Sequence, residues 1–91
     1  MMREARFKSH CVRDLKSVKR RGWDEDTFYT VLGKLMREGR LPAHHKPHKL
    51  SGPYAGWWEC HIENDWLLIY ALTETEVVLF RTGTHADLFG K

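Results

Sequence analysis

Apolar residues in the first quarter of the chain predict a short strand followed by a helix. Residues 3–8 (REARFK) predict the strand. The helix is expected to begin with Ser9 as its N-cap and to end at Gly22. Its buried face is expected to carry Val12, Leu15 and Val18, which recur at helical spacing.

A second helix follows at once and has the clearest signals in the sequence. Asp24 is a favourable N-cap, Trp23 before it is placed to pack on Phe28, and Gly39 ends the helix. Apolar residues then repeat at i, i+3, i+4, i+7 and i+8, which predicts a stripe facing a core. The stripe consists of Phe28, Val31, Leu32, Leu35 and Met36.

The second half of the chain predicts strands after an irregular connection. Residues 41–56 contain all three prolines and two glycines, and a connection of this length is often functional. Strands are expected over 57–63, 66–72 and 77–82, with a tight turn at residues 64–65. The middle strand is apolar on both faces, as expected at the centre of a sheet.

These elements predict a single α+β domain spanning residues 1–91, with neither an internal repeat nor a linker. A short N-terminal strand, a two-helix hairpin and an antiparallel three-stranded meander would complete a small sheet. The helices would cover one face of this sheet, and the other face would stay at least partly open. A site is expected on that open face.

Composition narrows the setting of the protein. The two cysteines, Cys11 and Cys60, lack the spacing of a metal-binding pair and are expected to pack as small buried hydrophobes in a reducing compartment. No apolar run approaches the roughly 20 residues that cross a bilayer, so a cytoplasmic protein is expected.

The charge distribution suggests an anionic partner. The net charge is +3, but eight basic residues against two acidic ones give the first 21 residues +6. Lys16, Lys19 and Arg20 fall on the first helix and are candidates for contacts with nucleic acid. A solvated helix face is the alternative explanation of the same charges.

Five polar residues of the last half are the candidate chemical groups. Alternation places Trp58, Cys60 and Ile62 toward the core and His61 on the opposite face, together with Arg81 if the register allows. The remaining three lie in a turn, after the last strand and in the proline-bounded loop. They are Asp65, His85 and His48.

These residue types suit the cleavage of RNA through its own 2′-hydroxyl. Such cleavage needs a base, an acid and a cation for the phosphate, and histidine serves both proton-transfer roles near neutral pH. Arginine offers a planar fork for two phosphate oxygens. Trp66 or Phe89 is expected to stack on an unpaired base.

Each candidate also has a structural explanation. Asp65 is a common turn residue, Arg81 is a possible edge-strand ion-pair partner, and tryptophans are more often packing residues. A metal site formed by His44, His45, His48 and Cys60 with His61 is the chemical alternative, but the spacing does not fit structural zinc. We expect neither a metal nor another cofactor.

The segment HKPHKLSGPYAGWWECHIENDWLLIYALTETEVVLFRTGTHADLFG closely resembles the YafQ-type toxins, a branch of the RelE/ParE superfamily of bacterial toxin–antitoxin systems. The blocks HIENDWLLIY and RTGTHADLFG are the specific parts of the match. The resemblance implies a ribosome-dependent endoribonuclease that cuts mRNA in the decoding site. It also implies a cognate antitoxin and a monomeric free toxin.

By the same resemblance, seven residues would form the catalytic and substrate-handling set: His48, His61, Asp65, Trp66, Arg81, His85 and Phe89. His85 would be the general acid and Arg81 would bind the scissile phosphate. The base would be His48, His61 or Asp65, and the choice stays open at this point.

Two other functions compete with the nuclease. One is a toxin of the same fold that poisons DNA gyrase, although relatives of that kind lack the histidine and arginine set. The other is a non-catalytic RNA- or protein-binding module that uses the basic N-terminal segment. The second would bind ribosomes with steep salt dependence and leave mRNA whole.

Overall fold

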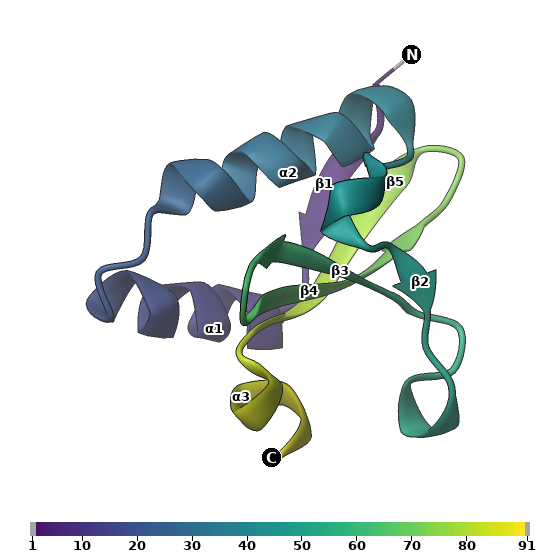
Figure 1. Cartoon of the computed structure of the whole chain (residues 1–91). Coiled ribbons are helices and arrows are strands. Elements are labelled where there is room, and N and C mark those ends of the chain that lie inside the picture. Colours follow the sequence, from purple (N-terminus) through teal and green to yellow (C-terminus); the bar gives the residue numbers. More distant parts are fainter. Residues whose placement is uncertain (1, 91) are drawn as a thin grey trace.

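The computed structural model describes residues 2–90, and it confirms the α+β architecture (Figure 1). A strand and two helices open the chain, and a mixed sheet and a short helix close it. In chain order the elements are β1 (Glu4–Phe7), α1 (Ser9–Arg20), α2 (Glu25–Glu38), the 3-10 turn η1 (Ala43–His45), β2 (His48–Lys49), the 3-10 turn η2 (Gly52–Tyr54), β3 (Trp58–Glu63), β4 (Trp66–Leu72), β5 (Glu76–Gly83) and α3 (His85–Phe89).

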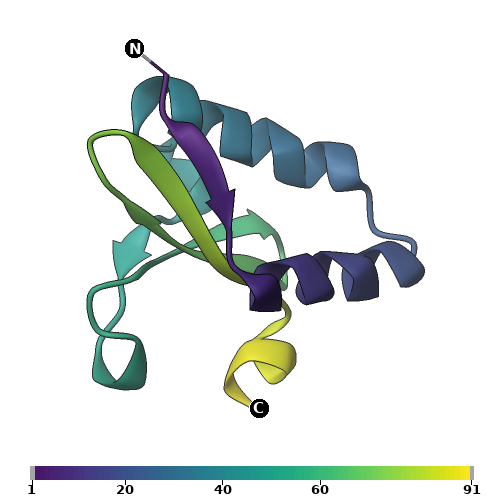
Figure 2. The ribbon, with the colours of Figure 1, turned by 180° about the vertical axis from the view of Figure 1, so that it is seen from behind.

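The five strands form one sheet in the order β1-β5-β4-β3-β2. The predicted meander is β3-β4-β5, in which neighbouring strands are antiparallel. β1 lies beside β5 and runs parallel to it, from Glu4 opposite Glu76 to Phe7 opposite Leu79 (Figure 2). Since β1 ends there, the last residues of β5 face the start of α1 instead of a strand.

Helix α1 differs in detail from the prediction. Its N-cap is Lys8, and Ser9 is the first helical residue, so the expected Ser9 cap is wrong. The buried residues are Cys11 and Val18, and Val12 is 41% exposed. The face set by Cys11 and Val18 turns toward β5, and this rotation carries Val12 out to the surface.

Helix α2 begins and ends as its sequence predicts. The Asp24 carboxylate accepts a hydrogen bond from the Asp26 amide, and Gly39 adopts the left-handed conformation that ends the helix. Trp23 packs against the core cluster that contains Phe28, and its ring lies 5.1 Å from the Trp66 ring.

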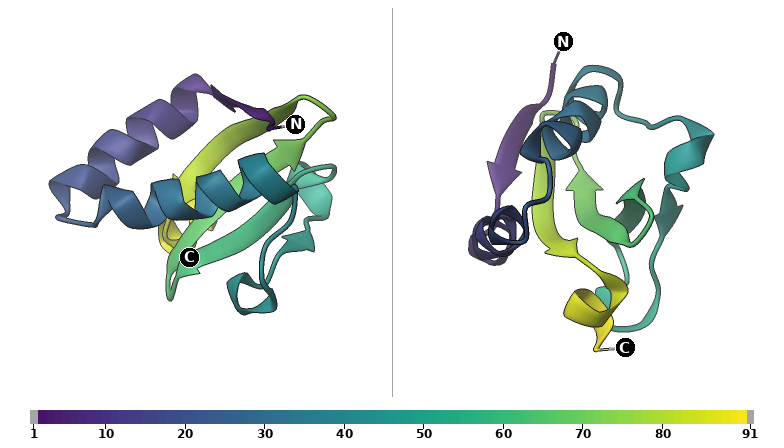
Figure 3. Two further views of the ribbon diagram at one scale, coloured as in Figure 1. Left: turned by 90° about the horizontal axis from the view of Figure 1, so that it is seen from above. Right: turned by 60° about the vertical axis from the view of Figure 1, so that its left-hand side comes forward.

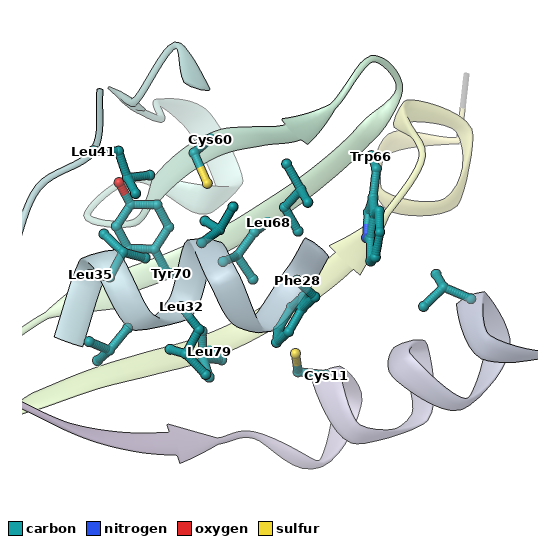
Figure 4. Close-up of a cluster of buried hydrophobic side chains, with 14 residues drawn as sticks. Cys11, Phe28, Leu32, Leu35, Leu41, Cys60, Trp66, Leu68, Tyr70 and Leu79 are labelled. Carbon is teal, nitrogen blue, oxygen red and sulfur yellow. The ribbon is translucent and has the colours of Figure 1, made fainter. Parts of the chain in front are cut away.

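The main core lies between the two helices and one face of the sheet (Figure 4). Tyr70, Phe28 and Leu35 are its largest fully buried side chains. Cys11 and Cys60 are free thiols inside it, and burial raises the pKa of each to about 12. Both cysteines therefore pack as small hydrophobes, as predicted.

The other face of the sheet is less open than the sequence suggested. Leu67, Ile69 and Leu88 form a second, small cluster that is covered by residues of the 50–57 connection and by Phe80. This connection lies on the opposite side of the sheet from α1 (Figure 3, right). Apolar side chains therefore cover the middle of this face, and the polar candidates lie around them.

Two local features were not predicted. β2 is a two-residue strand inside the proline-bounded connection, where His48 pairs with Glu59. β3 contains a bulge between His61 and Glu63 just before the turn at Asn64 and Asp65.

Among residues 2–90, none of the helices has the length and apolar character that a bilayer-spanning segment requires.

Candidate active site

His61, Asp65 and His85 come together at one end of the sheet. His61 lies near the end of β3, Asp65 lies in the turn to β4, and His85 is the first residue of α3. The rings of His61 and His85 are 6.0 Å apart between centroids, and their planes are inclined by 63°. Side chains 24 positions apart in sequence are therefore direct neighbours.

Asp65 holds His85 by two contacts to the same carboxylate oxygen. The backbone amide of His85 donates to Asp65 Oδ1 over 3.0 Å, and the ring Nδ1–H donates to it over 2.6 Å. The hydrogen bond from the His85 backbone amide, followed by the one from the His85 ring, lowers the pKa of Asp65, so the carboxylate stays ionised. This arrangement leaves Nε2 of His85 directed away from the carboxylate.

His61 is also held through its Nδ1, but by a backbone carbonyl. Its Nδ1 lies 3.3 Å from the Asn64 carbonyl, a contact in which the nitrogen carries the proton. Among residues 2–90, no hydrogen-bond partner is present for Nε2 of His61. A neutral His61 in this tautomer therefore presents an unprotonated nitrogen.

Helix α3 carries His85 and a second candidate, Phe89. Thr84 and Asp87 form a capping box at its start, and Leu88 anchors it in the small cluster. The Phe89 ring is 38% exposed, 6.4 Å from the His85 ring and 5.6 Å from the Tyr54 ring. It is therefore an accessible aromatic surface beside the histidine.

Arg81 is bound to α1. Its Nε and Nη2 donate to the two oxygens of Asp14 over 2.7 and 3.2 Å, and the Thr82 amide donates to Asp14 Oδ2 over 3.1 Å. Asp14 thereby provides a hydrogen-bond acceptor for a backbone amide of β5 that lies beyond the end of β1. Hydrogen bonding to Asp14 raises the pKa of Arg81, and Tyr54 is a further neighbour of the guanidinium. The Cα of Arg81 pairs with that of Ile69.

His48 lies on the far edge strand of the sheet. Its Nδ1 is 2.9 Å from the Lys46 carbonyl, and its Nε2 is 3.3 Å from the carboxylate of Glu59, which is buried. Glu59, Ile69 and Arg81 occupy one row across the sheet, so two strand spacings of about 4.8 Å separate Arg81 from Glu59. His48 therefore lies on the opposite flank of the apolar cluster from Arg81.

Trp66 does not have the predicted placement. Its ring is only 4% exposed, contacts Trp23 and Phe28, and donates through Nε1 to Thr82 Oγ1 over 2.9 Å. Stacking of Trp66 on a base was therefore a wrong expectation, because the ring is part of the core. Lys16, Lys19 and Arg20 are exposed on α1, and Lys19 lies 3.4 Å from Glu25.

Three residues near the candidates were not expected from the sequence to belong to a site: Asp14, Tyr54 and Glu59. His45 was expected there only as an alternative metal ligand. The His45 ring is buried, its Nδ1 donates to the His61 carbonyl over 2.7 Å, and its Nε2 lies 3.3 Å from Lys34 Nζ. Burial lowers its pKa. The histidine-rich run HHKPH at residues 44–48 is the only sequence pattern that draws attention to His45, and no sequence pattern marks Asp14 as part of a site.

No cluster of three or more His, Cys, Asp or Glu side chains within residues 2–90 has the geometry to hold a metal ion. The His44 and His45 rings contact each other, with centroids 4.1 Å apart and planes inclined by 39°, and His48 contacts Glu59. Cys60 points into the core, away from His61, as alternation requires. The residues proposed as alternative ligands therefore do not direct their side chains to one common point.

Comparison with known proteins shows the family to which the chain belongs. Residues 3–90 match the family model described as "Bacterial toxin of type II toxin-antitoxin system, YafQ". The chain is 35% identical over 91 residues to the mRNA interferase toxin YafQ of Escherichia coli K12, with 99% of both chains covered.

Solved structures of similar proteins share the fold. YafQ from E. coli strain BL21(DE3) is 34% identical with a TM-score of 0.90, and the match covers 97% of this chain and 99% of that one. The E. coli DinJ–YafQ toxin–antitoxin complex contains a chain that is 35% identical with a TM-score of 0.88, covering 99% and 100%. The chain therefore belongs to the YafQ family of bacterial toxins of type II toxin–antitoxin systems.

Proposed function

We propose that this toxin is an mRNA interferase, a metal-free endoribonuclease that cuts translated mRNA on the ribosome by attack of the 2′-hydroxyl on the adjacent phosphate. The observation that carries the proposal is the pair of facing histidines, His61 and His85, with Asp65 behind one of them. The name of the E. coli relatives supports the same activity.

His61 acts as the general base. Its Nδ1–H is engaged by the Asn64 carbonyl, which leaves the Nε2 lone pair for the 2′-hydroxyl proton. Asp65 is less suited to this role because its Oδ1 already accepts two hydrogen bonds from His85. His48 is less suited because both of its nitrogens contact acceptors.

His85 acts as the general acid. Asp65 fixes the orientation of the ring through Nδ1–H, and Nε2–H delivers a proton to the leaving 5′-oxygen. The proton that His61 removes and the proton that His85 donates balance over the reaction. Because the two rings are only 6.0 Å apart between centroids, one phosphate beside them is expected to contact both histidines.

Arg81 stabilises the charge on the phosphate, and Phe89 stacks on a neighbouring base. Arg81 uses Nε and one hydrogen of Nη2 for Asp14, so its remaining hydrogens can be donated to phosphate oxygens. Phe89 has the exposure that stacking requires. We retain His48 as a residue at the border of the RNA path, together with Glu59.

The exposed Lys16, Lys19 and Arg20 bind ribosomal RNA phosphates. A cognate antitoxin neutralises the toxin, as the DinJ–YafQ complex of the similar protein suggests. The free toxin is a monomer that acts in the cytoplasm.

Primer extension on a message translated in a purified system tests the proposal. The parent protein is expected to produce cuts within codons that disappear without ribosomes or when the nucleotide before the cut is 2′-deoxy. His85→Ala is expected to lower cleavage at least about 100-fold while the protein still co-sediments with ribosomes. In cells that express the toxin, intact message with parallel damage to DNA would indicate a gyrase poison. In the purified system, ribosome binding without cleavage would indicate a binding module.

A further inference from the structure

The helix that carries His85 cannot position itself. α3 has five residues, and isolated helices shorter than about 12 residues are marginal in water. Its position therefore depends on contacts with the body of the protein. Leu88 supplies an apolar anchor, and the Tyr54 hydroxyl donates to the Leu88 carbonyl over a long 3.4 Å.

The charged side chain of Asp87 connects α3 to the end of α1. Its carboxylate accepts the Thr84 amide over 2.9 Å as part of the capping box. The same carboxylate accepts two hydrogen bonds from Arg21, Nη1 to Oδ2 over 2.7 Å and Nη2 to Oδ1 over 3.0 Å. This parallel, two-point geometry fixes orientation as well as distance.

Arg21 reaches α3 because of its place at the end of α1. It is the C-cap residue of that helix, and its guanidinium lies 5.4 Å from the centroid of the Trp23 ring. Asp14, seven residues earlier and so two turns away on the same side of α1, holds Arg81. One side of α1 therefore contacts both β5 and α3, and the two contacts line a shared hollow of about 160 Å³.

The chain between the two contacts is short and tightly packed. Gly83 has φ +154°, and a Cβ built on it would lie 2.8 Å from Asp87 Oδ2 and 2.9 Å from Asp87 Cβ. Asp87 is therefore seated directly against the backbone that leads from β5 into α3. A shift of Asp87 would move this backbone and His85 with it.

We infer that Arg21 and Asp87 are positioning residues for His85: the ion pair between α1 and α3 holds the histidine in register with Asp65 and His61. The inference rests on the proposed function for its catalytic consequence, but the placement of His85 can be measured without activity. The low pKa that Arg21 imposes on Asp87 keeps the pair charged at neutral pH.

The test compares Arg21→Gln, Asp87→Asn, the double variant and Arg21→Lys with the parent. Arg6→Gln serves as the matched control, because it removes an exposed ion pair with Glu76 that is remote from α3. Three quantities are measured: the hydrogen-exchange rate of the His85 amide, the ¹⁵N and ¹H resonances of its ring, and single-turnover mRNA cleavage at saturating ribosomes.

In Arg21→Gln, the His85 amide is expected to exchange at least about 10-fold faster, and the ring resonances are expected to shift. Cleavage is expected to fall about 10- to 100-fold, the scale of a small misplacement of a catalytic group. Arg21→Lys should recover part of each loss, and the double variant should be no worse than either single variant. Arg6→Gln should change none of the three.

Unchanged exchange and ring resonances in Arg21→Gln and Asp87→Asn would overturn the inference, whatever happens to cleavage. Additive losses in the double variant would overturn it as well. If the parent cleaved no RNA, the proposed function would fail, and the exchange and resonance data would still decide whether Arg21 holds His85 in place.

Discussion

The contact between Asp14 and Arg81 gives the sharpest prediction about the body of the protein. Asp14→Asn keeps the shape of the side chain and removes its charge. The side chains of Arg81 and Asp14 are only 20% and 17% exposed, and three donors converge on the carboxylate. The substitution leaves a guanidinium that is mostly desolvated without its counter-charge, and it weakens the bond to the Thr82 amide.

The expected loss is about 2–3 kcal/mol of unfolding free energy. Hydrogen bonds to charged groups contribute about 1.5–3 kcal/mol, and breaking a fully buried ion pair costs about 3–5. Partial exposure and the remaining amide oxygen of asparagine place the value below the second range. In a domain of this size, the loss corresponds to a fall in Tm of about 8–24 °C.

Urea denaturation followed by tryptophan fluorescence measures this quantity. Glu76→Gln is the matched control, because Glu76 lies on β5 like Arg81. The substitution breaks an exposed ion pair of 3.5 Å with Arg6 on β1. The control should lose no more than about 1 kcal/mol. A loss below about 0.5 kcal/mol in Asp14→Asn, or one equal to that of the control, would show that the contact does not hold α1 against β5.

Three further predictions concern stability. Burial lowers the pKa of His45, so the stability that the neutral ring contributes is present above the ordinary histidine pKa near 6.5 and is lost as pH falls through the lowered pKa of the folded protein. His45→Gln should therefore flatten the decline of unfolding free energy between pH 7 and 5, and an equal decline in both proteins would contradict this. Leu35→Ala should cost about 2–5 kcal/mol in chemical denaturation, because the side chain is fully buried, and a loss under about 1 kcal/mol would contradict its core placement. Gly83→Ala should lower Tm and slow cleavage together through the contact with Asp87, whereas parent-like values of both would mean that the α3 junction tolerates a side chain.

The sequence predicted the elements in which local signals agree. In α2, the Asp24 cap, the apolar stripe and Gly39 all indicate the same boundaries, and the structure confirms them. β4 was predicted with its observed bounds because the turn at Asn64 and Asp65 marks its start. His61 and Asp65 were placed at the ends of strands by the same signals.

Contacts between residues far apart in the sequence determine the features of the fold and the site that the sequence did not predict. Asp14 meets Arg81 across 67 positions, and only the early end of β1 makes room for it. Trp66 begins a strand that is apolar on both faces, so alternation does not indicate which way its ring points. β2 exists only because His48 pairs with Glu59, and no local pattern of two residues predicts a strand.

The central claim is that His85 donates the proton to the leaving 5′-oxygen. The most direct measurement compares the parent with His85→Gln on ribosome-bound mRNA whose scissile 5′-oxygen is replaced by sulfur, a leaving group that needs no protonation. We predict that the variant, slow on normal RNA, cleaves the sulfur-substituted RNA at nearly the rate of the parent. A variant that stays as slow on this substrate would show that His85 is not the general acid.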